Sequence, residues 1–178
     1  PYAGLDLVEK IFDNTKSKND QDHLPVVLLS MPDQIVDRTS FLLGKTKVNP
    51  AHEEFKIISK LESVGASVVG VPCNTSHAPK IFDVIIKKLK ESNSEIKLLH
   101  MIEEVANCIT KEYPNVKKVG LLCTLGTYSS EVYSRILEKK GISVIVPSEK
   151  VKEDLVHDAI YNKRYGIKSQ SSPISDIA

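Results

Sequence analysis

Short apolar runs alternate with amphipathic helical patterns along most of the 178 residues, and this alternation constrains the fold more than any other feature of the chain. Unbroken apolar runs fit strands that are covered on both faces, and such strands are usually parallel. The runs predict strands over residues 25–31, 67–71, 96–99, 116–123 and 142–146. We therefore expect an α/β fold with mainly parallel sheets flanked by helices, in which ligands bind beyond the carboxyl ends of the strands.

Helical patterns fill the segments between these strands. Asn49 and Pro50 are suited to the start of a helix that Gly65 would end. Further helical patterns cover residues 5–12, 79–89, 102–111, 129–140 and 151–160. Strands and helices thus follow one another as they do in βαβ units.

Two strand ends resemble each other, because residues 68–75 and 119–127 both place small polar side chains directly after an apolar strand. This likeness is either a coincidence of strand-end composition or the sign of two related lobes that face one site. The second interpretation predicts a first lobe over residues 1–96 and a second over residues 97–178.

The ends of the sequence lead us to expect that both lobes are incomplete. Pro1 stands in place of Met and leads directly into a helical pattern, so the first strand would be missing. Residues 169–178 resemble a loop that enters a new element, so a later part of the second lobe would be missing too.

Charge and composition favour a small-molecule ligand. The 24 Lys and Arg residues balance 23 Asp and Glu residues without a dense basic block, so nucleic acid is not the expected partner. No apolar run approaches the roughly 20 residues that cross a bilayer, and we expect a cytoplasmic protein without a membrane partner. Neither G-x-G-x-x-G nor a Walker motif is present, and three Cys without ligand spacing predict neither a disulfide framework nor a metal site.

Cys73 is the strongest candidate for chemistry, because it ends a predicted strand and precedes the polar run Asn74-Thr75-Ser76-His77. N–H groups at a helix start would favour its thiolate, which can act as a base or a nucleophile. The polar residues that follow suit a carboxylate or an oxyanion. The same pattern equally fits a buried small side chain followed by helix-capping residues.

Two other candidates are weaker. His77 follows Cys73 by four residues and could pair with the thiolate as an imidazolium, but helix capping or surface exposure fits as well. Cys108 sits in a helical run and is expected to be structural rather than catalytic.

Several motifs in the right order resemble one enzyme family over nearly the whole chain. Residues 72–77 (PCNTSH) look like the first catalytic cysteine motif of the aspartate/glutamate racemases, and residues 121–127 (LLCTLGT) resemble their second motif of glycine and threonine. The aspartate racemase branch has features similar to residues 20–25 (DQDHLP), 37–39 (DRT) and 165–168 (YGIK).

This resemblance implies a homodimeric racemase that needs neither pyridoxal phosphate nor another cofactor, with the substrate between two pseudo-symmetric lobes. It implies a two-base mechanism, in which one cysteine thiolate removes the α-proton of aspartate or glutamate and a second thiol returns a proton to the opposite face. Cys73 matches the first base. The matching substrate-binding positions are Asn74, Thr75, Thr124, Thr127, Arg38 and Lys168, of which the last two would receive a side-chain carboxylate.

The chain departs from the family pattern at the second base. The family's second cysteine follows a later strand in a Gly-Cys-Thr setting that this sequence does not contain. Cys123 lies at the analogous strand end, but the family carries a small inert residue there, so we do not assign it as the base. Two alternatives stay open: Cys73 could be a nucleophile on a maleate or hydantoin substrate, or the protein could bind a small acid without turnover.

Overall fold

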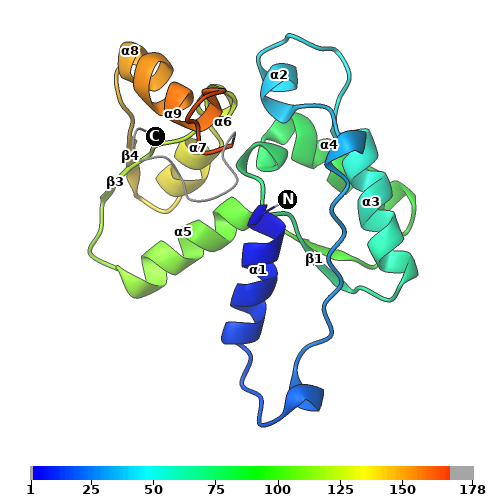
Figure 1. The fold of residues 1–178 in the computed structure, drawn as a ribbon. Coiled ribbons are helices and arrows are strands. Elements are labelled where there is room, and N and C mark those ends of the chain that lie inside the picture. Colours follow the sequence, from blue (N-terminus) through cyan, green and yellow to red (C-terminus); the bar gives the residue numbers. More distant parts are fainter. Residues whose placement is uncertain (1, 169–178) are drawn as a thin grey trace.

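The computed structural model describes residues 2–168, and they form two small parallel sheets flanked by helices (Figure 1). In the first sheet β1 (Val68–Gly70) pairs with β2 (Lys97–Leu99), and in the second β3 (Lys118–Gly120) pairs with β4 (Ser143–Ile145). The predicted α/β fold with parallel sheets is confirmed. β2 belongs to the first sheet although it follows residue 96, where the sequence placed the boundary between the lobes.

Helices connect and cover the strands. The first half contains α1 (Tyr2–Asp13), η1 (Asp20–Asp22), η2 (Pro32–Gln34), α2 (Arg38–Leu42), α3 (Ala51–Ser63), η3 (Asn74–His77) and α4 (Pro79–Glu91). The second half contains α5 (Met101–Glu112), α6 (Leu125–Ser130), α7 (Val132–Glu138), α8 (Glu149–Val151), the π-helical η4 (Lys152–His157) and α9 (Asp158–Tyr161).

The predicted helices form, with shifts at their ends that have local causes. Asn49 accepts a hydrogen bond from the Ala51 N–H at 3.0 Å, and Gly65 ends the helix with a positive φ of 93°, a conformation that favours glycine. The helix predicted over 129–140 is instead two helices, α6 and α7. The break lies at Glu131, whose left-handed φ of 53° interrupts the helical backbone.

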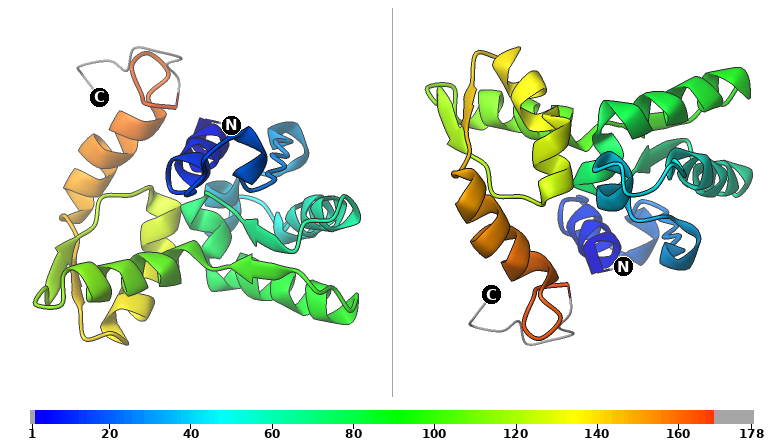
Figure 2. Two further views of the ribbon diagram at one scale, coloured as in Figure 1. Left: turned by 90° about the horizontal axis from the view of Figure 1, so that it is seen from below. Right: turned by 90° about the horizontal axis from the view of Figure 1, so that it is seen from above.

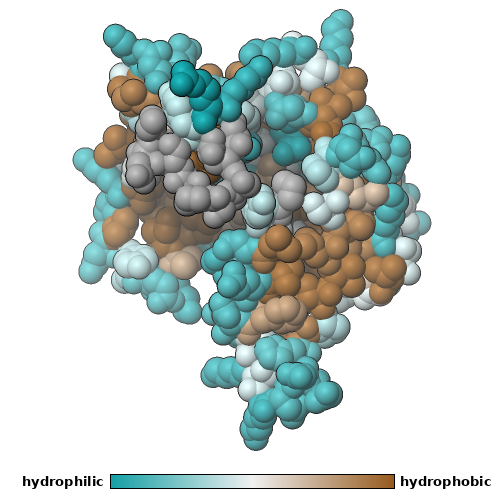
Figure 3. All heavy atoms as spheres, viewed as in Figure 1, coloured by the Kyte–Doolittle hydropathy of each residue, from teal (hydrophilic) through white to brown (hydrophobic). Residues whose placement is uncertain are grey.

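The strand predicted over residues 25–31 is wrong. This segment has no strand partner among residues 2–168, and a strand needs a neighbour to receive its backbone hydrogen bonds. Leu28 instead packs on Gly4 of α1. Figure 3 shows apolar side chains gathered on the face that α1 and this segment share, and the exposed ones include Tyr2, Leu5, Leu24, Val27 and Leu28.

Two hydrophobic cores hold the two halves. In the first, Ile81 and Ile85 of α4 are buried against Ile58 of α3 and Val69 of β1. In the second, Ala106, Leu137 and Ile142 pack together with Val119 and Val144 at the sheet. Each sheet is thus anchored to its own helices.

The halves meet where α2, η3 and α6 pack against one another, and in Figure 2 the yellow-green α6 faces the first half of the chain. Gly126 makes this approach possible, because a Cβ on it would lie 2.9 Å from the Thr39 Cα. The carboxyl ends of β1 and β3 lead into η3 and α6, so both strand ends reach this junction.

No helix within residues 2–168 is both long and apolar enough to cross a membrane. The loop expected over residues 169–178 and the role expected for Pro1 lie outside the described residues.

We predict that Ile85→Ala lowers the free energy of unfolding by about 2–5 kcal/mol, because it leaves a cavity where a fully buried side chain joins α4 to the first core. Urea unfolding followed by circular dichroism measures the change. The control Val64→Ala alters a residue that is 64% exposed and is expected to cost no more than about 0.5 kcal/mol. An equal loss of unfolding free energy in the two variants would contradict this account of the core.

Candidate active site

Cys73 lies at the point where the chain leaves β1 and enters η3. Its backbone is extended, its carbonyl accepts from the Ser76 N–H at 3.2 Å, and its sulfur is 3.4 Å from the Thr75 hydroxyl. The side chain is half-buried. The thiol is therefore surrounded by hydrogen-bonding groups of the next turn, as the position before a helix start led us to expect.

Arg38, the first residue of α2, brings a positive charge to this thiol. Burial disfavours the Cys73 thiolate, but the Arg38 charge and hydrogen bonds from Ser76 and Thr75 outweigh it, so the pKa of Cys73 lies below its ordinary value. Burial also acts against the Arg38 cation, yet the neighbouring thiol and the Glu54 carboxyl raise its pKa, and the guanidinium stays charged. The two groups stabilise each other's ionised forms.

Asn74 is tied to the second half of the chain. The hydroxyl of Tyr133 on α7 donates to Asn74 Oδ1 at 2.6 Å. This hydrogen bond orients the Asn74 amide. The amide nitrogen carries two N–H groups that can donate to another partner. Thr75 is buried beside it, with its hydroxyl turned toward Cys73.

α6 brings two further hydroxyl groups to the junction. Thr124 precedes α6 and Thr127 lies within its first turn, and their hydroxyl oxygens are 3.2 Å apart. Thr127 is 2% exposed, so its hydroxyl is buried.

Lys168 reaches the same region through Tyr161. Its amine lies 4.5 Å from the centre of the Tyr161 ring and donates to the Tyr161 hydroxyl at 3.1 Å. That hydroxyl is 3.4 Å from the hydroxyl of Thr39, the residue after Arg38. Lys168 therefore lies at the junction but remains largely exposed.

His77 is neither the imidazolium partner nor the surface residue that the sequence allowed. It is 1% exposed, and its Nε2–H donates to the Val71 carbonyl at 2.9 Å. Burial lowers the pKa of His77 to about 4, and the neighbouring His100 acts in the same direction. A neutral buried imidazole is neither an imidazolium partner nor a surface residue; it fixes the loop between β1 and Cys73.

The other two cysteines differ from Cys73 in their surroundings. Cys123 is buried, and burial raises its pKa to about 12, so its thiol stays protonated. Cys108 is exposed on the outward face of α5.

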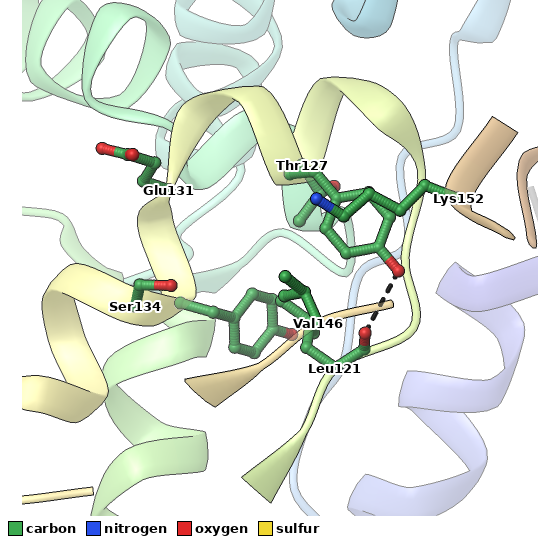
Figure 4. A pocket seen from close by; sticks show the side chains of 8 residues that line it. Leu121, Thr127, Glu131, Ser134, Val146 and Lys152 are labelled. Atoms are coloured by element: carbon green, nitrogen blue, oxygen red, sulfur yellow. Dashed lines mark hydrogen bonds between the residues drawn. The ribbon is translucent and has the colours of Figure 1, made fainter. Parts of the chain in front are cut away.

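A small cavity of about 160 Å³ lies on the α6 and α7 side of the junction (Figure 4). It is lined by Leu121, Thr127, Tyr128, Glu131, Tyr133, Ser134, Val146 and Lys152. Lys152 reaches across the Tyr128 ring, with its amine 5.0 Å from the ring centre, and pairs with Glu149 at 2.7 Å. The cavity shares Thr127 and Tyr133 with the cluster around Cys73, while Cys73 itself does not line it.

The donor set around Cys73 suits an organic anion. Its members are one guanidinium, one amide and several hydroxyls, which are hydrogen-bond donors to carboxylates. Across residues 2–168, no three His, Cys, Asp or Glu side chains come together in a group that could hold a metal ion.

Comparison with known proteins places the chain in a family. The family model for Asp/Glu/hydantoin racemases matches residues 1–168. The chain belongs to this racemase family. It is 28% identical over 155 residues to the broad specificity amino-acid racemase RacX of Bacillus subtilis. The matched region makes up 82% of this chain and 60% of that protein.

Two solved structures share the fold of this chain. The Picrophilus torridus aspartate racemase matches with a TM-score of 0.72 and 28% identity over 89% of this chain and 63% of that chain. An aspartate racemase homologue from Pyrococcus horikoshii matches with a TM-score of 0.66 and 24% identity over 92% of this chain and 66% of that chain. The chain thus spans about three fifths of the length of its relatives.

Sequence reasoning missed three residues of the cluster. Glu54 on α3 is buried and accepts a hydrogen bond from Ser76, and the only sequence signal was a carboxyl on the apolar side of its helix. Tyr133 and Tyr161 stand in ordinary helical patterns, and only their contacts with Asn74 and Thr39 reveal them.

We predict that Arg38→Gln raises the pKa of the Cys73 thiol, because it removes the opposite charge that favours the thiolate. The rate of iodoacetamide alkylation of the Cys73 peptide, followed by mass spectrometry against pH, measures the shift. Arg135→Gln removes an exposed arginine of α7 and should leave the profile unchanged. An unchanged profile in Arg38→Gln would show that Arg38 does not set the thiol's ionisation.

Proposed function

We propose that this racemase acts on aspartate or glutamate without a cofactor and that Cys73 is the base on one face of the substrate. The observation that carries the proposal is the Cys73 thiol facing the Arg38 guanidinium at a strand end where both halves of the chain meet. A thiolate held by a cation is a usable base near neutral pH, whereas an ordinary thiol has a pKa of about 8.5.

Proton removal from Cα demands that the charge developing on the substrate be stabilised. The α-carboxylate would be bound by the amide nitrogen of Asn74 and by hydroxyls of Thr75, Thr124 and Thr127. The Tyr133 hydroxyl holds the Asn74 amide in one orientation, so these donors are set before the substrate arrives. Fixed donors favour the carbanion-like transition state because they need no reorganisation.

An acidic side chain is the substrate feature that the two cations favour. Arg38 Nε is buried and has no hydrogen-bond partner among the described residues, so it offers a donor to a carboxylate. Lys168 supplies a second charge through the Tyr161 and Thr39 contacts. The likeness to an aspartate racemase supports the acidic substrate, whereas the likeness to a broad specificity racemase supports a wider range.

The second base is not assigned to a residue of this chain. Cys123 stands at the position where the family resemblance places a small inert residue, and Cys108 is exposed on α5. That the enzyme is a cytoplasmic homodimer stays a prediction. A hydantoin substrate is the second candidate, since the matching family also covers hydantoin racemases.

We predict that Cys73→Ser lowers the exchange of the aspartate α-hydrogen with deuterium from the solvent by roughly a hundredfold or more, because a serine hydroxyl is a far weaker base at neutral pH. Nuclear magnetic resonance of aspartate in deuterium oxide measures the exchange. Cys123→Ser serves as the matched control and should exchange at the rate of the unaltered protein. Exchange that survives in Cys73→Ala would remove Cys73 from the role of base.

A further inference from the structure

The two strand ends that resemble each other in sequence are each closed by a ring-bearing side chain from the helical segment that follows. His77 of η3 reaches back to the end of β1, and Tyr128 of α6 reaches back to the end of β3. Neither residue has a part in substrate binding or proton removal as proposed above. Their matching contacts therefore call for a physical explanation.

In the first half, the Val71 carbonyl just after β1 accepts two hydrogen bonds. The Cys73 N–H donates to it at 2.8 Å, and the His77 ring donates to it through Nε2–H at 2.9 Å. A carbonyl oxygen has two lone pairs, so both acceptor sites of this oxygen are used. His77 thus binds the same oxygen atom that fixes the backbone of Cys73.

The His77 ring is held in this position by its surroundings. It is 1% exposed, and its centre lies 5.3 Å from the Phe82 ring and 4.8 Å from the His100 ring. His100 is itself fixed, because its Nδ1 accepts from the Glu103 N–H at 3.3 Å. Burial lowers the pKa of His77 to about 4, so the ring is neutral, and its one hydrogen lies on Nε2 because a carbonyl can only accept.

Tyr128 makes the corresponding contact in the second half. Its hydroxyl donates at 3.1 Å to the carbonyl of Leu121, the first residue after β3, as the dashed line in Figure 4 shows. The same hydroxyl accepts from the Cys123 N–H at 3.0 Å. It therefore lies between an N–H and a carbonyl that, at the end of β1, bond to each other directly.

Each contact closes a turn that carries a residue of the candidate site. The turn closed by His77 carries Cys73, whose sulfur lies 3.4 Å from the Thr75 hydroxyl. The turn closed by Tyr128 carries Thr124, the residue that precedes α6. A shift of either turn would move these side chains away from the positions that the site requires.

We propose that His77 and Tyr128 are matched positioning residues, His77 for the thiol of Cys73 and Tyr128 for the hydroxyl of Thr124. Each donates one hydrogen bond to the carbonyl at the end of its strand and so fixes the turn before substrate arrives. The purpose of these contacts rests on the proposed function, whereas the contacts themselves do not. Groups that are fixed in advance need less reorganisation during proton transfer.

Alkylation of Cys73 by iodoacetamide, followed against pH by mass spectrometry of its peptide, tests the role of His77. His77→Leu removes the donor, so Cys73 can move away from the Arg38 charge that favours its thiolate. The profile should shift to higher pH, and the rate at neutral pH should fall severalfold.

Two further variants at this position separate the hydrogen bond from packing. His77→Gln carries an amide donor near the place of Nε2 and should restore most of the rate. His77→Asn is too short to reach Val71, so it replaces His77→Leu in the comparison if that variant does not fold. His52→Leu removes an exposed imidazole of α3 and should leave the profile unchanged.

Calorimetry with aspartate tests the role of Tyr128. Tyr128→Phe keeps the ring but leaves the Cys123 N–H and the Leu121 carbonyl without the hydroxyl that joins them. The affinity for aspartate should fall severalfold, because Thr124 loses its fixed position. Alkylation of Cys73 should follow the profile of the unaltered protein, since the change lies in the other half.

Three results would overturn the proposal: a His77→Leu profile that superimposes on that of the unaltered protein, a His77→Gln profile no better than that of His77→Leu, or a Tyr128→Phe variant with unchanged affinity for aspartate. Neither measurement needs turnover. The expected pattern together with absent α-hydrogen exchange in the unaltered protein would keep both positioning residues and reject the proposed racemase activity.

Discussion

The guanidinium of Arg38 faces the Cys73 thiol, and the ionisation of both this thiol and the Glu54 carboxyl depends on this one half-buried cation. Burial by itself would keep the thiol and the Glu54 carboxyl protonated. The positive charge of Arg38 reverses this effect at the sulfur and favours the thiolate. The cation also lies where a substrate carboxylate would compete for it, so binding and proton removal are electrostatically linked in the function we propose.

The close contact of the two halves keeps this charge in place. Gly126 lets α6 approach Thr39, the residue after Arg38, to a distance that a Cβ would prevent. Tyr133 and Asn74 add a hydrogen bond across the same contact. Because each half has its own core, the junction depends on a few short contacts, and small changes there should alter the site more than the fold.

The sequence predicted the sheets and helices well because apolar runs and helix-ending residues such as Gly65 act locally. It failed over residues 25–31, because an apolar run becomes a strand only where a partner strand accepts its hydrogen bonds. Cys73 and Arg38 were found by motif. Glu54 and Tyr133 were missed because their importance arises from contacts across the fold, which no spacing in the sequence encodes.

Titration of the thiolate absorbance in a protein that carries Cys108→Ser and Cys123→Ser tests the central claim most directly, since Cys73 is then the only thiol. The account predicts that the Cys73 thiolate forms with a pKa below the ordinary thiol value of about 8.5. A thiol that ionises at or above that value would contradict it, because the Arg38 charge would then not be governing the sulfur.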